Sequence, residues 1–280
     1  MSLVINTNVS ALNAYQNLNN NQNMMSDAIE KLSSGLRINK AANDAAGLSI
    51  SQGLTSQING LTQAVSNAQD GQDVAQIADG ALGTTQQILQ RMRTLVIQAA
   101  NTGTQDASSL SAIGSEITSL NSQLTNISAQ TKYGATNLLD GTFNNSFQVG
   151  ANGGDTIALN LSTANVAATA LGTSTLVIAG SPAAYTTANS TADLTKIDAA
   201  ITTVSDARSG IGATENQLSY TVSNLQTAIT NVTASRSNLT DADLATEVTS
   251  MTQAQILTQA ATSVLAQANS APQAILKLLQ

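Results

Sequence analysis

The stretch IDAAITTVSDARSGIGATENQLSYTVSNLQTAITNV, residues 197–232, carries an apolar side chain at nearly every third or fourth position. These positions are Ile197, Ile201, Val204, Ile211, Leu218, Val222, Leu225, Ile229 and Val232. Arg208 and Glu215 are the polar exceptions in the series. Residues three and four apart share one face of an α-helix, so the spacing predicts a long helix packed as a coiled coil. At a rise of about 1.5 Å per residue, this helix is about 50 Å long.

The same spacing continues toward both chain ends. Toward the N-terminus the apolar positions are Met25, Ile29, Leu32, Leu36, Leu54, Ile58, Leu61, Val65, Val74, Ile77, Ala81, Ile88, Met92, Leu95 and Ala99. A turn is predicted at residues 102–106, and a shorter helix follows with Ile113, Ile117, Leu120, Leu124 and Ile127 on one face. A last helix carries Leu244, Val248, Met251, Ile256, Leu257, Val264 and Leu265. Pro272 is expected to end or kink that helix. Neither end can cover its apolar face locally, so we expect the two ends to pair.

The middle of the chain has a different pattern. SFQVGANGGDTIALNL, residues 146–161, has alternating stretches on both sides of a glycine-rich turn, which predicts a β-hairpin near residues 142–161. LVIAG, residues 176–180, suggests another short strand, and residues 181–191 suggest a loop. The sequence therefore predicts a mainly α fold, in which long helices from both chain ends pack as coiled coils around a small β-hairpin insert.

Composition excludes several classes of function. Charged residues make up 10% and aromatic residues 2% of the 280 positions, and the net charge is −7. The ten basic residues are scattered, so a nucleic-acid surface is not expected. Residues 248–274 are free of charge, but Gln, Thr, Ser and Asn interrupt them throughout, so we expect no membrane insertion. The chain has no His and no Cys, which removes the usual metal sites, catalytic triads and thiol chemistry. We expect no enzyme and no cofactor.

Two clusters are candidates for ligand binding. Asp241, Asp243 and Glu247 form the densest acidic group, close to an expected helix start. Acidic side chains there cap free N–H groups, and we favour that interpretation over a calcium loop, which needs more oxygens and a turn glycine. Gly150, Gly153 and Gly154 lack the Lys and Ser or Thr of a phosphate-binding loop, so a turn is favoured.

Three stretches of the chain are similar to one known family. They are LSSGLRINKAANDAAGLSIS (residues 32–51), TKYGATNLLDGTFNNSFQVGANGGDTIAL (131–159) and DADLATEVTSMTQAQILTQAATSVLAQANSAPQAILKLL (241–279). They resemble, in that order, the N-terminal signature of bacterial flagellin, the end of its first helical region with the hairpin that follows, and its C-terminal signature. Residues 162–193 are the part of the chain that lies outside the resemblance.

The resemblance implies a structural subunit that polymerises into the bacterial flagellar filament for motility. It implies an inner domain, residues 1–44 and 241–280, that lines the filament core. It also implies a helical rod domain, residues 45–240, which carries the hairpin. A short loop near residues 162–193 would replace the outer domains, so the chain resembles a minimal flagellin. The hairpin, with Gly150, Gly153 and Gly154 at its turn, is implied to take part in switching between subunit packings.

The resemblance also implies partners and a location. The partners are further copies of the chain, a flagellar export chaperone, and the hook-associated junction and cap proteins. The N-terminal segment MSLVINTNVSALNAYQNLNNN lacks the basic start and long apolar core of a secretory signal peptide. We therefore expect an extracellular flagellar location, reached through the flagellar type III apparatus without cleavage of a signal peptide.

A further implied partner is a Toll-like receptor of animal hosts, which would recognise the monomer. LQRMRTLVIQAAN, residues 89–101, resembles the motif that this receptor binds in many flagellins. Arg91 and Leu95 match two contact positions of that motif, and Glu116 matches a third. Leu95 also fits the apolar helix face, so a buried position is the alternative for it. Arg91 and Glu116 are alternatively ordinary surface charges.

Other classes of protein remain to be compared with a flagellin. The hook–filament junction protein resembles flagellin at both ends, but the GLRINKAANDAAGLSIS and SVLAQAN matches favour flagellin. An adhesin or immune-evasion protein with the same fold would differ from it by failing to assemble into filaments. An enzyme is disfavoured because the chain lacks His and Cys.

Overall fold

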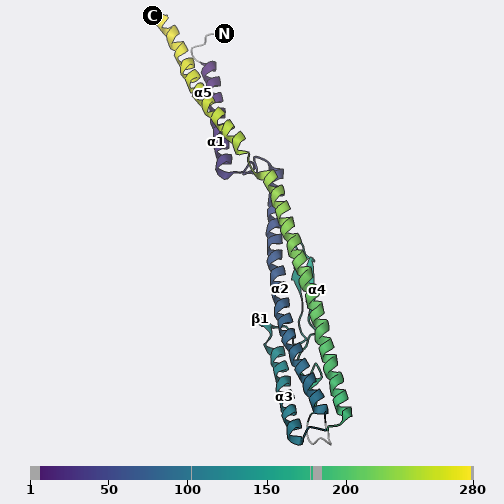
Figure 1. Ribbon diagram of the computed structural model, residues 1–280. Coiled ribbons are helices and arrows are strands. Elements are labelled where there is room, and N and C mark those ends of the chain that lie inside the picture. Colours follow the sequence, from purple (N-terminus) through teal and green to yellow (C-terminus); the bar gives the residue numbers. More distant parts are fainter. Residues whose placement is uncertain (1–6, 102, 177, 179–184, 279–280) are drawn as a thin grey trace. The chain divides into compact units, whose positions relative to one another are not determined.

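The structure is a computed structural model that describes residues 7–101, 103–176, 178 and 185–278, with side chains through residue 270. The helices of this part of the chain are α1 (Val9–Ser34), α2 (Ala45–Ala100), α3 (Ala107–Gln130), α4 (Thr187–Thr240) and α5 (Leu244–Leu278) (Figure 1). A 3-10 turn, η1, covers Thr173–Thr175. The mainly helical fold predicted from the apolar spacing is confirmed. The turn predicted between α2 and α3 is also found, although Thr102 lies outside the described residues.

Two small strand pairs interrupt the helices. β3 (Asn144–Gln148) and β4 (Thr156–Asn160) pair antiparallel, with Gln148 opposite Thr156, and they confirm the predicted hairpin. β1 (Lys132–Tyr133) and β2 (Thr136–Asn137) form a second antiparallel pair that the sequence pattern did not predict. Two residues per strand are too few to show the alternation by which a strand is recognised.

The boundaries of the long helices differ from the predicted ones in two places. α4 begins at Thr187, inside the segments 162–193 and 181–191 for which a loop was predicted, and residues 181–184 lie outside the described residues. α5 passes through Pro272 instead of ending there. The strand predicted at residues 176–180 is not found at Leu176 or Ile178, and its other three residues lie outside the described part.

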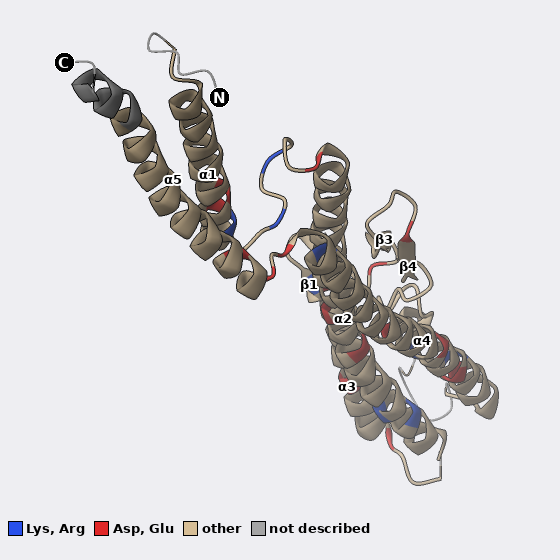
Figure 2. Cartoon of the chain, turned by 90° about the horizontal axis from the view of Figure 1, so that it is seen from above, with Lys and Arg blue, Asp and Glu red and all other residues tan. Residues whose placement is uncertain are grey.

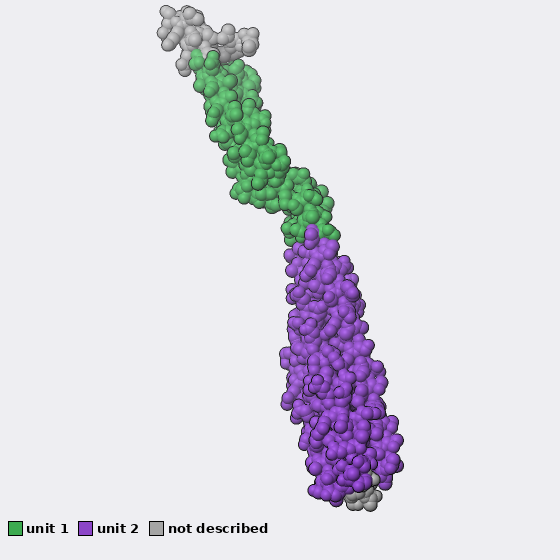
Figure 3. Space-filling model, in the orientation of Figure 1, with its two compact units in different colours: residues 1–57, 231–280 green, residues 58–230 purple. Residues whose placement is uncertain are grey.

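The chain divides into two compact units, coloured separately in Figure 3. Unit 1 comprises residues 1–57 and 231–280, and unit 2 comprises residues 58–230. α2 and α4 contribute residues to both units. Unit 1 therefore holds α1, α5 and the parts of α2 and α4 next to them, and unit 2 holds α3 and the strands.

Unit 2 has a continuous apolar core between α2, α3, α4 and the segment after β2. Its buried members include Leu82, Leu89, Met92, Leu95, Leu110, Ile117, Leu124, Leu138, Leu139, Leu159, Leu161, Val166, Tyr185, Ile197, Val204 and Ile211. Each fully buried Leu, Ile, Val or Met side chain contributes about 1.5–3 kcal/mol. Ala68, Val149, Ile157 and Leu218 form a second buried cluster beneath the hairpin. Unit 2 thus has the burial that an independently folding domain needs.

The polar exceptions of the α4 series are accounted for by a polar layer against α2. The Arg208 guanidinium donates from Nε and Nη2 to both carboxylate oxygens of Asp79, at 2.8 and 3.1 Å, and from Nη1 to Gln86 Oε1 at 2.9 Å. Glu215 lies one heptad further on, and its pKa is raised by partial burial and by the nearby charge of Asp79. This bidentate pair between Arg208 and Asp79 is a specific polar contact between α4 and α2 within an otherwise apolar helix interface.

Candidate assembly surface

α1 and α5 pair antiparallel within unit 1, as the apolar faces of the chain ends predict (Figure 1). Asn8 lies against Ala268, Lys31 against Glu247, and Leu36 forms a β-bridge with Asp241. As the residue number rises along α1, the number of its partner on α5 falls, so the two helices are antiparallel. The Lys31 Nζ and Glu247 Oε1 atoms are 3.1 Å apart, and both side chains are partly buried.

The contact between α1 and α5 combines fully buried alanines with larger apolar side chains that are only partly buried, namely Leu18, Met25, Leu32, Met251 and Leu265. Of the side chains described in these two helices, the buried ones are Ala14, Ala28 and Ala254. An alanine buries a single methyl group, which contributes about 0.8 kcal/mol. Isolated helices are marginal in water, and because the Leu and Met side chains of this contact stay partly exposed, the pair has little stability of its own.

Many large apolar side chains of the same two helices remain exposed. Those on α1 and α5 that remain exposed are Val9, Leu12, Tyr15, Met24, Ile29, Leu244, Val248, Ile256, Leu257 and Val264. Ile256 is 60% exposed and Val264 is 58% exposed. Charged residues are sparse along both helices (Figure 2), and the exposed apolar side chains are interspersed with uncharged Asn, Gln, Ser and Thr. Apolar surface of this extent marks a site that another protein covers.

The segment that follows α1 and the segment that precedes α5 are joined by backbone hydrogen bonds, at what we call the inner end of the α1–α5 pair. The Arg37 N–H donates to the Thr240 carbonyl at 2.7 Å, and the Ala242 N–H donates to the Gly35 carbonyl at 3.0 Å. The Arg37 side chain also donates from Nη2 to the Leu239 carbonyl at 2.7 Å. This end of the α1–α5 pair therefore has a defined geometry that does not depend on side-chain burial.

The acidic residues at the start of α5 serve as a cap and an ion-pair partner. Asp243 Oδ1 accepts from the N–H groups of Ala245 and Thr246 at 3.0 and 3.4 Å, as predicted for a capping residue. The Thr246 hydroxyl and these backbone N–H groups lower the pKa of Asp243. Glu247 pairs with Lys31 instead of facing Asp243. In the described part of the chain, no group of three or more acidic side chains could hold a metal ion.

The turn of the β3–β4 hairpin contains the three glycines singled out in the sequence. The Val149 N–H donates to the Asp155 carbonyl at 2.8 Å, which closes the turn around them. Gly154 has a φ of 101°, a conformation that favours glycine, whereas Gly153 has open space around it. The turn end of the hairpin is anchored to α2, because Asn67 Nδ2 donates to the Gln148 carbonyl at 2.9 Å.

The three residues matched to a receptor contact are not equally accessible. Arg91 Nε donates to Glu116 Oε1 at 2.8 Å, and this ion pair joins α2 to α3 on an exposed surface. The hydrogen bond to Glu116 raises the pKa of Arg91. Leu95 is 1% exposed and belongs to the core of unit 2. The structure therefore brings Arg91 and Glu116 together at the surface and places Leu95 beneath them, the alternative that its apolar spacing had left open.

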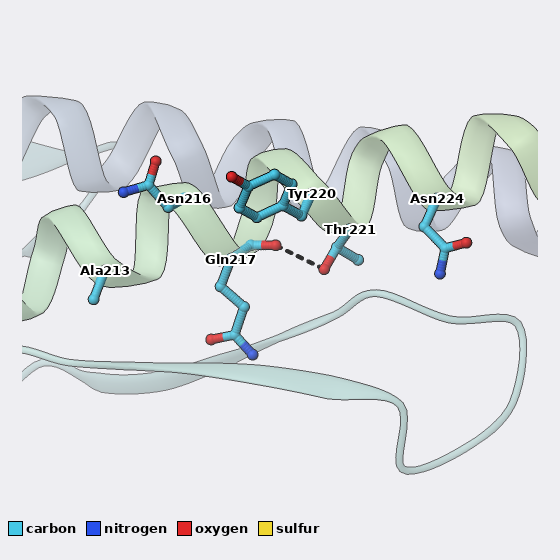
Figure 4. Close-up of a pocket in the computed structure, with 6 residues that line it drawn as sticks. All are labelled: Ala213, Asn216, Gln217, Tyr220, Thr221 and Asn224. Carbon is cyan, nitrogen blue, oxygen red and sulfur yellow. Dashed lines mark hydrogen bonds between the residues drawn. The ribbon is translucent and has the colours of Figure 1, made fainter.

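A shallow groove on α4 is lined by Ala213, Asn216, Gln217, Tyr220, Thr221 and Asn224 (Figure 4). The Thr221 hydroxyl donates to the Gln217 carbonyl of its own helix at 2.8 Å. Amide, hydroxyl and phenol groups along a single helix provide no acid–base pair and no activated nucleophile. No helix within the described residues is long and apolar enough to cross a membrane.

Two groups of the structure were not anticipated from the sequence. Tyr185 is buried and donates its hydroxyl to Asp193 Oδ2 at 3.4 Å, and burial raises the pKa of both side chains. Asn8 caps α1 and also donates to α5. An Asn directly before a helix is a recognisable capping signal, but a contact to residue 268 leaves no trace in local sequence.

The chain is similar to known proteins over nearly its full length. Residues 5–144 match the family described as the bacterial flagellin N-terminal helical region, and residues 194–279 match the bacterial flagellin C-terminal helical region. The flagellin of Bacillus subtilis (strain 168) is 42% identical over an alignment of 306 positions, which covers 99% of each chain. The flagellin of Halalkalibacterium halodurans is 41% identical, with 99% of this chain and 100% of that one covered. A crystal structure of Bacillus cereus flagellin aligns with a TM-score of 0.48 and 29% identity, over 57% of this chain and 88% of that one.

Proposed function

The chain belongs to the bacterial flagellin family, and we propose that its two ends, residues 1–44 and 241–280, form the inner layer of the filament. As a flagellin, it is a structural subunit of the extracellular flagellar filament and not an enzyme. The observation that supports the proposed arrangement is the surface of α1 and α5. Only alanines are fully buried in their contact, and ten large apolar side chains of the two helices remain exposed, where neighbouring subunits would cover them.

Removal of both ends tests this proposal. A chain shortened to residues 43–241 keeps the whole of unit 2 and its core. We expect it to remain helical and monomeric at concentrations at which the full chain sediments as filaments. Filaments formed by the shortened chain would contradict the proposal, because unit 2 alone would then supply the assembly contacts.

The residues 45–240 form, in this proposal, the rod-like outer layer, and the short segment 162–193 stands in place of outer domains. The hairpin takes part in switching between subunit packings. Its support is the turn that contains Gly150, Gly153 and Gly154, because Gly154 has a positive φ and both Gly153 and Gly154 have open space around them. Gly153→Ala fits the open space, whereas Gly154→Ala strains a positive φ. We expect the Gly154 variant to alter the range of filament waveforms over pH and salt and the Gly153 variant to alter it less. Unchanged waveforms in both would contradict a switching role.

Export proceeds, we further propose, through the flagellar type III apparatus without cleavage of a signal peptide, assisted by an export chaperone. The hook-associated junction and cap proteins are then the partners at the two ends of the filament. A chain without cysteine forms no disulfide that would obstruct passage in an unfolded state. Mass spectrometry of subunits from sheared filaments tests the route, since a subunit shortened at its N-terminus by a signal peptide would contradict it.

A Toll-like receptor of animal hosts recognises the monomer, in the last part of the proposal, through the exposed Arg91–Glu116 pair. An arginine beside a carboxylate offers donors and acceptors in a fixed orientation, which is common at interface centres. Leu95 is buried below the pair and supports the helix face rather than touching the receptor.

A matched ion pair on the same helix provides the control. Arg93 Nε lies 2.8 Å from Asp198 Oδ1, with an exposure similar to that of the Arg91–Glu116 pair. In a receptor-reporter assay on monomer, Arg91→Ala and Glu116→Ala should reduce signalling, and Arg93→Ala should not. Equal signalling by all three variants would contradict recognition at Arg91 and Glu116.

A further inference from the structure

The carbonyl of Ala268 lies inside α5, where the residue that would normally donate to it is a proline. In an α-helix, a carbonyl accepts from the N–H four residues later. For Ala268 that residue is Pro272, and proline has no N–H. α5 nevertheless continues to Leu278, so the carbonyl is not at a helix end where water would bind it freely. A backbone carbonyl without a partner is costly in proportion to its burial.

The side chain of Asn8 supplies the missing donor. Asn8 Nδ2 donates to the Ala268 carbonyl at 2.8 Å, across 260 positions of sequence. Asn8 Oδ1 accepts from the Ala11 N–H at 3.1 Å and caps α1. One amide thus serves both helices, because asparagine carries an acceptor and a donor on the same short side chain. Serine caps a helix equally well but has a shorter reach.

Backbone hydrogen bonds fix the relative position of the two helices at one end of the α1–α5 contact, and the rest of the contact is an apolar seam with one ion pair. The backbone bridge around Leu36 and Asp241 fixes the inner end. From there, α1 extends for 26 residues, about 39 Å at 1.5 Å per residue. Along this length the fully buried side chains are alanines and the larger apolar ones are only partly buried, so the seam holds few directional contacts that would select one register. Lys31 and Glu247 can follow a small shift because their side chains are long.

We propose that Asn8 is a positioning residue for filament assembly, and that it fixes the register of α1 against α5 through the carbonyl that Pro272 leaves without a donor. The hydrogen bond holds the outer end of the pair, so that exposed apolar residues such as Val9, Leu12 and Val264 meet a neighbouring subunit at defined positions. This inference rests on the proposed role of the chain ends in assembly.

A double-mutant cycle on the full chain tests it. Asn8→Ser keeps a neutral cap on α1 and removes the arm that reaches Ala268. Pro272→Ala gives α5 an N–H of its own for that carbonyl. The critical concentration for polymerisation of the purified chain is measured for both single variants and the double variant. Asn13→Ser, which changes an exposed asparagine of α1, is the control.

Asn8→Ser should raise the critical concentration roughly tenfold in the parent chain, the effect of leaving one partly buried carbonyl unpaired. In the Pro272→Ala background the same change should have less than about a twofold effect, since the carbonyl no longer needs Asn8. Equal effects of Asn8→Ser in both backgrounds would show that Asn8 acts as a cap alone, and no effect in either would show that it does not position assembly. Both results overturn the inference without touching the proposed function, which fails instead if the parent chain forms no filaments.

Discussion

Replacement of Ile256 by glutamine separates the stability of the monomer from the stability of the filament. Ile256 lies on α5 and is 60% exposed. Glutamine is a good helix former of similar length, so the substitution should leave the helix intact. Because the isoleucine side chain is mostly in water in the monomer, its loss should change the helicity and thermal unfolding of the monomer little.

The effect on assembly follows from the surface that remains to be buried. Complete burial of an isoleucine is worth about 1.5–3 kcal/mol. Covering the 60% of Ile256 that is exposed in the monomer therefore contributes about 1–2 kcal/mol per subunit. Every 1.4 kcal/mol corresponds to a factor of about ten in an equilibrium constant, so Ile256→Gln should raise the critical concentration roughly fivefold to thirtyfold.

The assay is sedimentation of polymer from a concentration series of purified monomer, with circular dichroism of the monomer alongside. Gln255→Ser alters the neighbouring exposed polar residue and should leave the critical concentration within about twofold of the parent value. An unchanged critical concentration for Ile256→Gln, with a monomer of unchanged helicity, would refute the claim that the exposed apolar face of α5 is an assembly contact.

Three further predictions concern unit 2 in the monomer. A Cβ at Gly114 would collide with the backbone carbonyl oxygen of Ile178, so Gly114→Ala should lower the free energy of unfolding by about 1–3 kcal/mol, measured by denaturant titration; a stable variant would show that this close approach is relaxed in solution. Arg208→Ala should cost about 1 kcal/mol because it leaves Asp79 beside Glu215 without a cation, and adding Asp79→Ala should recover part of the loss; strictly additive losses would contradict the polar layer. Burial raises the pKa of the Asp193 carboxyl in the folded state above its ordinary value of 3.8, so the folded state is most stable while this carboxyl is protonated, and that stability is lost as the pH rises through the folded-state pKa. Because Asn resembles the protonated carboxyl, Asp193→Asn should raise the free energy of unfolding relative to the parent chain more at pH 7 than at pH 4. An equal change at both pH values would contradict the direction of the pKa shift.

Local sequence was sufficient to predict the helices because their apolar side chains recur at helical spacing over many turns. The hairpin was equally predictable, since alternation on both sides of a glycine-rich turn is a local signal. Asp243 could be assigned as a cap for the same reason: its partners, Ala245 and Thr246, are its near neighbours in sequence. Each of these features depends on residues a few positions apart.

The features that sequence did not predict depend on distant residues. The first turns of α4 contain Thr, Asn and Ser, which favour helices weakly, and they are held by burial of Ser190 and Asp193 together with Tyr185. α5 does not end at Pro272, one of the two outcomes that the sequence predicted, and Asn8, from the other end of the chain, donates to the carbonyl that lacks the N–H of Pro272.

The candidate receptor residues show the same limit. Spacing placed Arg91 and Leu95 on one face of α2, but it could not say whether that face was solvent-exposed or part of the core. The structure shows that the arginine side chain reaches Glu116 on α3 while Leu95 packs inward. The position of α3 decides which of these two residues is buried. The residue pattern of α2 alone carries no information on where α3 packs.

A density map of the filament formed by the purified full-length chain tests the central claim most directly. The claim is that residues 1–44 and 241–280 are the assembly elements, because among the described side chains of α1 and α5 only alanines are fully buried and many large apolar residues are exposed. Electron cryomicroscopy should show two helices per subunit around the filament axis, with Ile256 and Val264 covered by neighbouring subunits. Filaments in which α1 and α5 lie on the outer surface, with those side chains still facing solvent, would contradict the account.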